Sequence, residues 1–277
     1  MTNPFWKMHG AGNDFVLVDD RALTFPEADR AFLRHLATPR TGVGSEGIIL
    51  IQPSATAHFR MRFFNPDGSE VDMCGNGARC VARLAHDLGV APSRMRFDTG
   101  AGLLAAEMAG TRVQLTLTSP KDWRLDQSLE LADGRHAFGF VNSGVPHVVM
   151  RVEDLDAVDV PSVGAAIRRH RAFAPKGTNA NFIAVTGPQS LRIRTYERGV
   201  EAETLACGTG IVAAGLIAGR MGWVQPAVQI TCANGDVLEV NYRLTPDGAE
   251  SVTLLGPAEY VFQGTMEYAG NRSINEL

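Results

Sequence analysis

Short stretches in which apolar and polar residues alternate recur along the whole chain. Such alternation predicts β-strands, because successive side chains of a strand point to opposite faces. The predicted strands, most of them bounded by turn residues, are Phe15–Val18, Ile48–Ile51, Phe59–Phe64, Val113–Thr118, Val148–Val152, Phe182–Val185, Leu191–Tyr196, Val228–Thr231, Val237–Tyr242 and Ser251–Leu255. Helical spacing of apolar residues is rarer and predicts Ala28–Ala37, Ala78–Leu88, Ala165–Arg171 and Ile211–Met221. The sequence therefore predicts an α+β fold dominated by strands.

Two distant stretches share one pattern. Residues 59–77 and 191–210 both begin as an apolar-Arg-apolar-Arg strand, then turn, and then reach a cysteine followed by Gly-polar-Gly and a helix. A glutamate precedes the cysteine by four residues each time, Glu70 before Cys74 and Glu203 before Cys207. Strand, turn, glutamate and helix together make coincidence a poor explanation. The repeat predicts two homologous halves.

We place the first half at residues 1–120 and the second at 121–260, with the boundary near Pro120. A final strand near 261–277 is expected to return to the first half. Each half of this length can form its own hydrophobic core. The predicted architecture is thus two pseudo-symmetric domains.

The repeated Cys-Gly-polar-Gly turn has a definite chemistry. It puts a sulfur at a helix N-terminus, where backbone amides and the helix dipole stabilise negative charge. The thiol pKa should then fall below its reference of ~8.5, and a substrate carboxylate would bind to the same amides. If the halves face each other, one thiolate can remove a proton from a carbon while the other thiol delivers one to the opposite face. This is the arrangement that a stereoinversion without a cofactor requires.

A cysteine beside glycines can also simply pack, since free cysteine is often buried. The duplication favours chemistry for Cys74 and Cys207. Cys80 and Cys232 lack the repeated context, so we assign both to packing.

The composition of the chain excludes several classes of partner and of binding site. The net charge of −4 and pI near 6.0 give no basic surface of the kind that nucleic acid requires. Neither a signal peptide nor an apolar run long enough to cross a bilayer is recognisable, so a cytoplasmic protein without a membrane partner is expected. Four cysteines without a C-x-x-C pair argue against a disulfide scaffold and against common zinc sites. No lysine stands in a context that suggests a pyridoxal site.

One motif resembles a nucleotide site without being one. Residues 42–47 match G-x-G-x-x-G, which must follow a strand and open a helix. Here a predicted helix precedes the motif and a predicted strand follows it, so dinucleotide binding is rejected. The calcium-like loops at Asn13 and Asn65 lack the oxygen spacing of an EF-hand.

The chain resembles the diaminopimelate epimerase family along nearly its whole length. The motifs that carry the resemblance are His9-Gly10-Ala11-Gly12-Asn13-Asp14-Phe15, Asn65-Pro66-Asp67-Gly68-Ser69, Cys74-Gly75-Asn76-Gly77, Thr178-Asn179-Ala180-Asn181-Phe182, Glu197-Arg198-Gly199 and Glu203-Thr204-Leu205-Ala206-Cys207-Gly208-Thr209-Gly210. The resemblance implies two domains, each a β-sheet or barrel wrapped around a central helix, with the active site in the cleft between them. It also implies cofactor-independent interconversion of LL- and meso-diaminopimelate, in lysine and peptidoglycan precursor biosynthesis.

The resemblance also assigns roles to residues. Cys74 and Cys207 would be the acid–base pair, with His147 and Glu197 as further catalytic residues. The remaining residues would bind substrate: Gly75, Asn76, Gly208 and Thr209 the reacting carboxylate, Asn13 and Glu197 the reacting end, and Asn65, Asn181 and Arg198 the distal end. An arginine suits the distal end, because its guanidinium can hold a carboxylate through two hydrogen bonds.

Two positions depart from the family pattern. Val145 stands where many members have an asparagine that touches substrate, and Glu46 stands where the family usually has aspartate. Val145 keeps open a racemase of another amino acid, such as histidine, on the same fold. A non-catalytic amino-acid binding protein and an isomerase that uses acidic residues are further alternatives, and the duplicated cysteines disfavour both. The expected partner is a small-molecule substrate, an amino acid, and a homodimer is left open.

Overall fold

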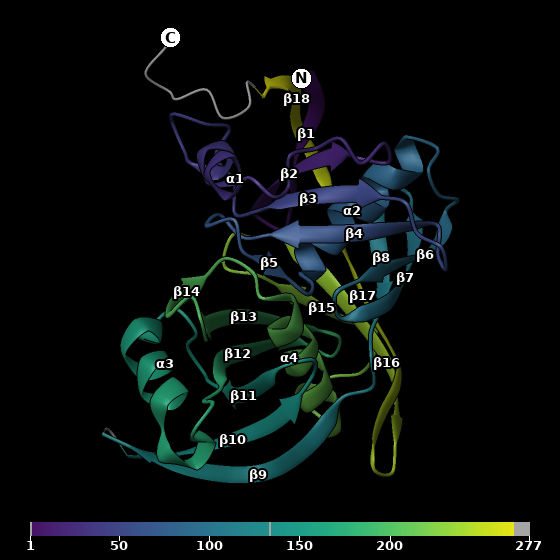
Figure 1. The fold of residues 1–277 in the computed structure, drawn as a ribbon. Helices are drawn as coiled ribbons and strands as arrows, with labels where there is room; N and C mark the ends of the chain where they lie inside the picture. The colour runs from purple at the N-terminus through teal and green to yellow at the C-terminus, as the bar shows by residue number, and fades with distance from the viewer. Residues whose placement is uncertain (1, 133, 269–277) are drawn as a thin grey trace. The chain divides into compact units, whose positions relative to one another are not determined.

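The computed structural model describes residues 2–132 and 134–268, and these form two compact units (Figure 1). The first unit consists of residues 1–113 together with 258–277, and the second of residues 114–257. The observed division falls inside strand β8 (Arg112–Thr116), shortly before the expected boundary near Pro120. Part of the expected final strand, residues 269–277, lies outside the described residues.

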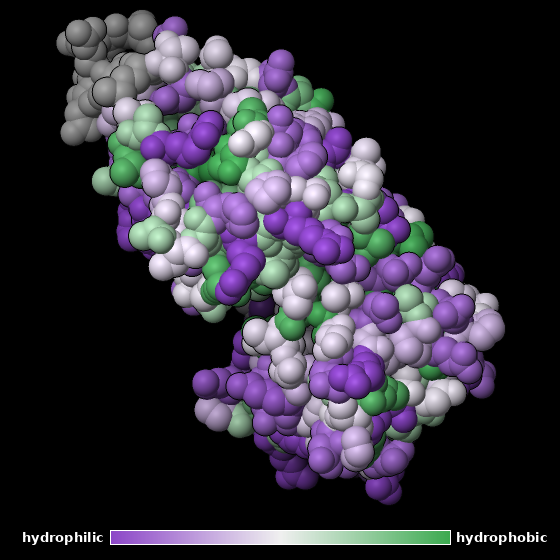
Figure 2. Space-filling view, turned by 90° about the vertical axis from the view of Figure 1, so that its right-hand side faces the viewer, coloured by the Kyte–Doolittle hydropathy of each residue, from purple (hydrophilic) through white to green (hydrophobic). Residues whose placement is uncertain are grey.

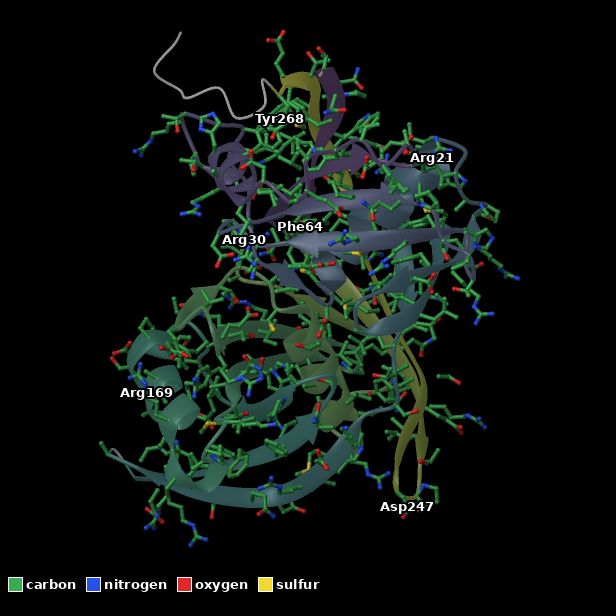
Figure 3. All side chains as sticks on the ribbon, in the orientation of Figure 1. Arg21, Arg30, Phe64, Arg169, Asp247 and Tyr268 are labelled. Atoms are coloured by element: carbon green, nitrogen blue, oxygen red, sulfur yellow. The ribbon has the colours of Figure 1, made fainter. Side chains whose placement is uncertain are left out.

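Within the described residues, the first unit contains eight strands besides β8, and two helices. Their bounds are β1 Thr2–Gly10, β2 Asn13–Asp19, α1 Arg30–Ala37, β3 Ile48–Gln52, β4 Phe59–Phe64, β5 Glu70–Val71, α2 Gly75–Asp87, β6 Arg94–Thr99, β7 Gly102–Ala109 and β18 Glu259–Glu267. Strand β18 pairs antiparallel with β1 from Thr2 to His9. Beyond β18, the hydroxyl of Tyr268 donates a hydrogen bond of 3.0 Å to Asp29 at the start of α1 (Figure 3).

The second unit repeats this composition of many strands and few helices. Its elements are β9 Lys121–Leu131, β10 Gly134–Asn142, β11 Pro146–Arg151, α3 Val160–Arg169, the short 3-10 helix Arg171–Phe173, β12 Asn179–Gly187, β13 Ser190–Glu197, β14 Ala202–Thr204, α4 Gly208–Arg220, β15 Val228–Thr231, β16 Val237–Thr245 and β17 Gly248–Pro257. The turn that joins β16 to β17 carries Asp247 (Figure 3).

The same strand pairing occurs in both units, which confirms the duplication in three dimensions. In the first unit β2 runs parallel to β3, β3 antiparallel to β4, and β4 antiparallel to β5 and parallel to β6. In the second unit β11, β12, β13, β14 and β15 pair in the same way and in the same order. The α+β fold with two sheet-dominated domains is therefore confirmed.

A buried helix packs against the strands of each sheet (Figure 1). Helix α2 contacts β1, β2, β3 and β7, and helix α4 contacts β10 to β13 and β15 to β17. Along α4 every residue from Gly210 to Ala218 is buried, because Ala and Gly let the sheet approach closely while Ile, Val and Leu fill the space between. The central helix carries a cysteine turn at its start in both units, so its burial holds that turn in place.

Second-layer helices cover the outside of the sheets. In the second unit, alternate residues of β11 and β12 (Val148, Met150, Ala180 and Phe182) form a core cluster with Val160 and Ile167 of α3. The residues between them, including His147 and Asn181, must point to the opposite face, toward α4. This alternation decides which side chains reach the cysteine turn.

The helix ends differ from the expected ones for local reasons. Helix α1 begins at Arg30 because the side chain of Asp29 accepts hydrogen bonds from the N–H groups of Ala31 and Phe32. Helix α3 begins at Val160, earlier than expected, because Asp159 caps it and a proline is tolerated in the first turn. The chain also forms strands that the pattern missed, namely β1, β5, β6, β7, β9, β10 and β14.

The surface carries a mixture of hydrophilic and hydrophobic residues, with the apolar ones scattered on the face shown in Figure 2. No helix within the described part of the chain is long and apolar enough to span a lipid bilayer.

Candidate active site

Both repeated cysteines stand immediately before a central helix, as the sequence predicts. Cys74 is the N-cap of α2 with φ −136° and ψ 124°, and Cys207 is the N-cap of α4 with φ −106° and ψ 106°. Their carbonyl oxygens accept the first helical hydrogen bonds, from Ala78 at 2.8 Å and Ile211 at 2.9 Å. Neither sulfur caps the helix. Each sulfur therefore lies at a helix N-terminus, the kind of position at which the amides of the first turn bind anions in proteins.

The repeated arginine and glutamate form the same ion pair in both units. Arg62 of β4 donates two hydrogen bonds of 2.8 Å to Glu70, and Arg194 of β13 donates two of 2.7 and 2.8 Å to Glu203. Each pair ties the short strand that precedes the cysteine to the longer strand beside it. The guanidinium of Arg62 holds the pKa of Glu70 below its ordinary value. The glutamate of the repeat is therefore a clamp for the cysteine turn.

The other two cysteines are inside the cores, in agreement with their assignment to packing. Cys80 is fully buried in α2, and burial raises the pKa of its thiol to about 12. Cys232 is also buried. Among the described residues, no group of three or more His, Cys, Asp and Glu side chains is placed to hold a metal ion.

In the first unit, a chain of hydrogen bonds runs past the start of α2. The guanidinium of Arg79, fully buried, donates to Oδ1 of Asn76 at 2.9 Å, and Nδ2 of Asn76 donates to Oδ1 of Asn13 at 2.5 Å. Nδ2 of Asn13 in turn donates to the carboxylate of Glu46. A guanidinium can only donate and a carboxylate can only accept, so the two ends fix the orientation of both amide groups. The structure thus brings together Asn13 and Asn76, two of the expected binding residues.

Glu46 has a charged and partly enclosed environment. It lines a cavity of about 440 Å³ together with Lys7, Asp14 and Arg40. Burial raises the pKa of its carboxyl group, and the charge of Asp14 acts in the same direction, while Asn13 and Lys7 oppose them. Glu46, whose effect the sequence left open, is therefore the anchor of Asn13.

Asn65, expected to contact the distal end of a substrate, lies in the turn after β4. Its backbone N–H donates to the carbonyl of Ser69 at 2.8 Å, and its side-chain Nδ2 donates to the hydroxyl of Ser69 at 3.3 Å. The side chain is half-buried. Its expected role stays a prediction.

In the second unit, His147 and Asn181 lie under the start of α4. Both are fully buried. Nε2 of His147 lies 2.9 Å from the hydroxyl of Thr209, and Nδ1 lies 3.1 Å from Nδ2 of Asn181. Burial, helped by the positive charge of Arg198, lowers the pKa of His147 to about 3. The imidazole is therefore neutral at physiological pH.

The polar atoms of Asn181 are occupied inside the unit. Nδ2 donates to the carbonyl of Val148 at 2.8 Å as well as facing His147, and Oδ1 accepts a hydrogen bond from the hydroxyl of Thr195 at 3.0 Å. These contacts hold the Asn181 side chain beside Gly210 in the first turn of α4. The role expected for Asn181 at the distal end of a substrate stays a prediction.

Asn179, two residues earlier on the same face of β12, is a site residue that sequence reasoning missed. Its Oδ1 accepts the backbone N–H of Arg198 at 2.8 Å, and its Nδ2 donates to the carbonyl of Pro146 at 3.0 Å. Its presence in the same motif as Asn181 and the two-residue spacing were the available signals. Asn179 fixes the backbone of Arg198 and the segment that contains Val145.

Glu197 and Arg198 follow each other at the end of β13. Both side chains are half-buried. The carboxylate of Glu197 accepts a hydrogen bond of 3.0 Å from the hydroxyl of Thr204, and the guanidinium of Arg198 donates to the carbonyl of Lys176 at 3.3 Å. The second unit thus gathers Cys207, Thr209, His147, Glu197 and Arg198 around the start of α4 and the end of β13.

Solved structures with the same fold support the duplicated architecture. A phenazine biosynthesis protein of the PhzF family from Bacillus anthracis matches with a TM-score of 0.73 at 16% identity, over 97% of this chain and 100% of that one. A probable proline racemase from Agrobacterium radiobacter K84 matches with a TM-score of 0.68 at 16% identity, over 96% of this chain and 93% of that one. At this identity the likeness shows the fold alone.

Sequence comparison defines the protein more closely. A diaminopimelate epimerase from Aquifex aeolicus is 39% identical over 275 residues, which cover 95% of this chain and 97% of the relative. The duplicated fold and the cysteine at each helix start belong to an epimerase, an isomerase by class. More particularly, the chain belongs to the diaminopimelate epimerase family, whose model it matches over residues 5–120 and 139–261.

Proposed function

We propose that the protein interconverts LL- and meso-diaminopimelate through two cysteines and without a cofactor. The observation that carries the proposal is the repeated helix start, with Cys74 before α2 and Cys207 before α4, in a chain of this family. One sulfur, as thiolate, takes the proton from the α-carbon, and the other, as thiol, gives a proton to the opposite face. The products of one direction are the substrates of the other, so each cysteine serves as base in turn.

The charge that develops on the reacting carboxylate needs donors that are already in place. Backbone N–H groups of Gly75 and Asn76 and of Gly208 and Thr209 stand at the two helix starts, where the helix dipole favours negative charge. An ideal Cβ on Gly75 would meet no atom within 4 Å, so the space beside this turn is open to a ligand. Asn13 and Glu197 are proposed to orient the reacting end, and Asn65 and Arg198 to hold the distal end.

The mechanism is tested by early turnover in D2O. With two bases, the product gains solvent deuterium at the reacting carbon faster than the recovered substrate does, because the group that receives the proton differs from the group that delivers one. Equal incorporation into product and recovered substrate would point to one base and would contradict the proposal.

The substrate is tested by a stereochemical assay with LL-diaminopimelate beside a panel of other L-amino acids, including histidine. Val145 is the feature that keeps a different substrate in view, because its side chain cannot form hydrogen bonds. The curated relatives named as diaminopimelate epimerases do not favour that alternative. Inversion of a panel member with a higher kcat/KM than diaminopimelate would overturn the substrate but not the mechanism. The proposed setting is lysine and peptidoglycan precursor biosynthesis in the cytoplasm.

A further inference from the structure

We propose that Asn181 and His147 are positioning residues that aim the hydroxyl of Thr209 at the sulfur of Cys207 and thereby stabilise its thiolate form. The inference rests on the proposed function for its catalytic meaning, but its geometry lies wholly inside the second unit. It assigns to His147 and Asn181 a role other than proton exchange or contact with substrate. The direction of each hydrogen bond in the series follows from the one before it.

Asn181 has only one satisfactory orientation. One of the two terminal atoms of its amide group lies 2.8 Å from the carbonyl oxygen of Val148, which can only accept a hydrogen bond. The group facing that carbonyl must therefore be the NH2 of Nδ2, and Oδ1 is left to accept from Thr195. The same NH2 group has a second hydrogen, which points to Nδ1 of His147 at 3.1 Å.

This orientation selects one form of His147. Because Asn181 donates to Nδ1, that nitrogen must carry a lone pair instead of a proton. A neutral imidazole then bears its proton on Nε2, which lies 2.9 Å from the hydroxyl oxygen of Thr209. His147 accordingly donates to Thr209, and full burial keeps the ring in this neutral form.

The hydroxyl of Thr209 is the last group in this series of hydrogen bonds before the sulfur of Cys207. Its oxygen accepts from His147, so its own proton is available to a different acceptor. The sulfur of Cys207 lies 3.6 Å from this oxygen, within the longer range of hydrogen bonds to sulfur. The backbone of Thr209 is fixed as well, since its carbonyl accepts a hydrogen bond of 2.7 Å from Ser143. A hydroxyl that donates to sulfur favours thiolate over thiol.

Gly210 supports this reading because the space beside it is already filled. A Cβ on Gly210 would collide with Oδ1 of Asn181 and would lie 3.4 Å from the sulfur of Cys207. The amide group and the sulfur thus both lie close to the Cβ position of one glycine in the first turn of α4. The nearby charged group that acts on His147 is Arg198, from the end of β13, which also disfavours a proton on the ring.

The test measures the Cys207 thiol without any substrate. In a Cys74→Ala, Cys232→Ala background the remaining cysteines are Cys207 and the fully buried Cys80, so the pH dependence of alkylation by iodoacetamide reports Cys207. Thr209→Val should raise the apparent thiol pKa by about one unit, which is about a tenfold lower alkylation rate below that pKa. Thr209→Ser keeps the hydroxyl and should restore most of the reactivity. Thr186→Val removes a hydroxyl that bonds to Ser190 in the same unit and is the matched control.

A pKa unchanged by Thr209→Val, in protein whose circular dichroism matches that of the parent, would overturn the proposal. A second measurement does not depend on any variant. Nitrogen-15 shifts of His147 should show a proton on Nε2 and none on Nδ1, and a protonated Nδ1 would equally overturn it. Since neither measurement uses substrate, a protein that fails to invert diaminopimelate but shows both signatures would sink only the proposed function.

Discussion

The two helix starts share a backbone frame but differ in what lies beneath it. Leu17 pairs with Ile49 in the first unit as Val149 pairs with Asn181 in the second. Two residues before Leu17 stands Phe15, and two residues before Val149 stands His147. Phe15 and Ile49 therefore occupy the places that His147 and Asn181 occupy, and all four are buried.

The glycine of each turn gives the same correspondence. A Cβ on Gly77 would strike Cδ1 of Ile49 and approach Phe15, while one on Gly210 would strike Oδ1 of Asn181. The ring of Phe15 also packs edge-on against Phe63, with centroids 5.9 Å apart. The first cysteine turn therefore packs on the apolar side chains of Phe15 and Ile49. The second packs on the hydrogen-bonded side chains of His147 and Asn181.

Both units thus keep the same backbone and the same Arg–Glu ion pair, but their polar networks lie in different places. In the first unit the hydrogen-bond network runs beside the helix from Arg79 to Glu46 and has a charged group at each end. In the second unit it runs beneath the helix through neutral groups. Two cysteines in the same frame need not have the same acidity.

Replacement of either cysteine is expected to have the largest effect on activity, and the loss should be similar in the two units. Cys74→Ala and Cys207→Ala should each lower kcat for inversion by at least about 10³-fold, because neither base can serve the other face. The measurement is optical rotation or chiral chromatography of the reaction mixture. Near-full activity in either variant would remove that cysteine from the mechanism.

Glycine replacement should separate the units. Gly210→Ala would displace the Asn181 amide and should lower the free energy of unfolding by about 1–3 kcal/mol, with at least about a tenfold loss of kcat. Gly77→Ala meets the terminal methyl of Ile49, which can rotate away, so a smaller loss is expected. Urea unfolding and initial rates measure both. Equal losses of stability and of kcat in the two variants would contradict the proposed difference between the residues that underlie the two cysteine turns.

The contribution of the two units to the pH dependence of stability should also differ, because the second has His147 where the first has Phe15. His147 has a pKa of about 3 when folded against 6.5 for a free imidazole, so between these values the unfolded chain binds the extra proton. The free energy of unfolding contributed by this residue is therefore lost as pH falls from 6.5 toward 3. His147→Gln should show a shallower acid decline in urea titrations than the parent. Parallel declines would mean that His147 does not titrate on unfolding.

The smallest effect is expected at Glu46, at the outer end of the first network. Glu46→Gln can present an NH2 group to Asn13 and should raise KM by about three- to tenfold, whereas Glu46→Asp keeps an acceptor and should raise it less. Because burial raises the pKa of Glu46, KM of the parent should increase on the acid side before an ordinary glutamate would titrate, and the Gln variant should lack this increase. Steady-state kinetics from pH 5 to 8 would show it, and a Gln variant with an unchanged KM would argue against the anchor.

Much of the frame could be read from the sequence. The strand, turn, glutamate and helix of the repeat predicted where Cys74 and Cys207 lie, because glycines and short apolar stretches restrict the local backbone strongly. The exposed strand β9 was missed because its residues are mostly polar and alternate poorly. Strand β1 was missed as well, since its strand character depends on pairing with β18 at the far end of the chain.

The side-chain contacts of the site could be predicted only in part. Both Asn179 and Asn181 carry the same side chain within one motif, and only the register of β12 against β11 places one beside Arg198 and the other under α4. Glu46 becomes interpretable only once β2 brings Asn13 beside it. Such contacts join residues far apart in sequence, and no local pattern encodes them.

The pairing of β18 with β1 has a consequence for how the chain matures during synthesis. Residues 114–257 form an uninterrupted unit, so all of its strands have left the ribosome before β18 does. The first unit is made first but must wait for its last strand, with the edge of β1 unpaired in the meantime. The half that is translated later can therefore be the first to finish folding, and the nascent N-terminal half is the one that would need protection by a chaperone.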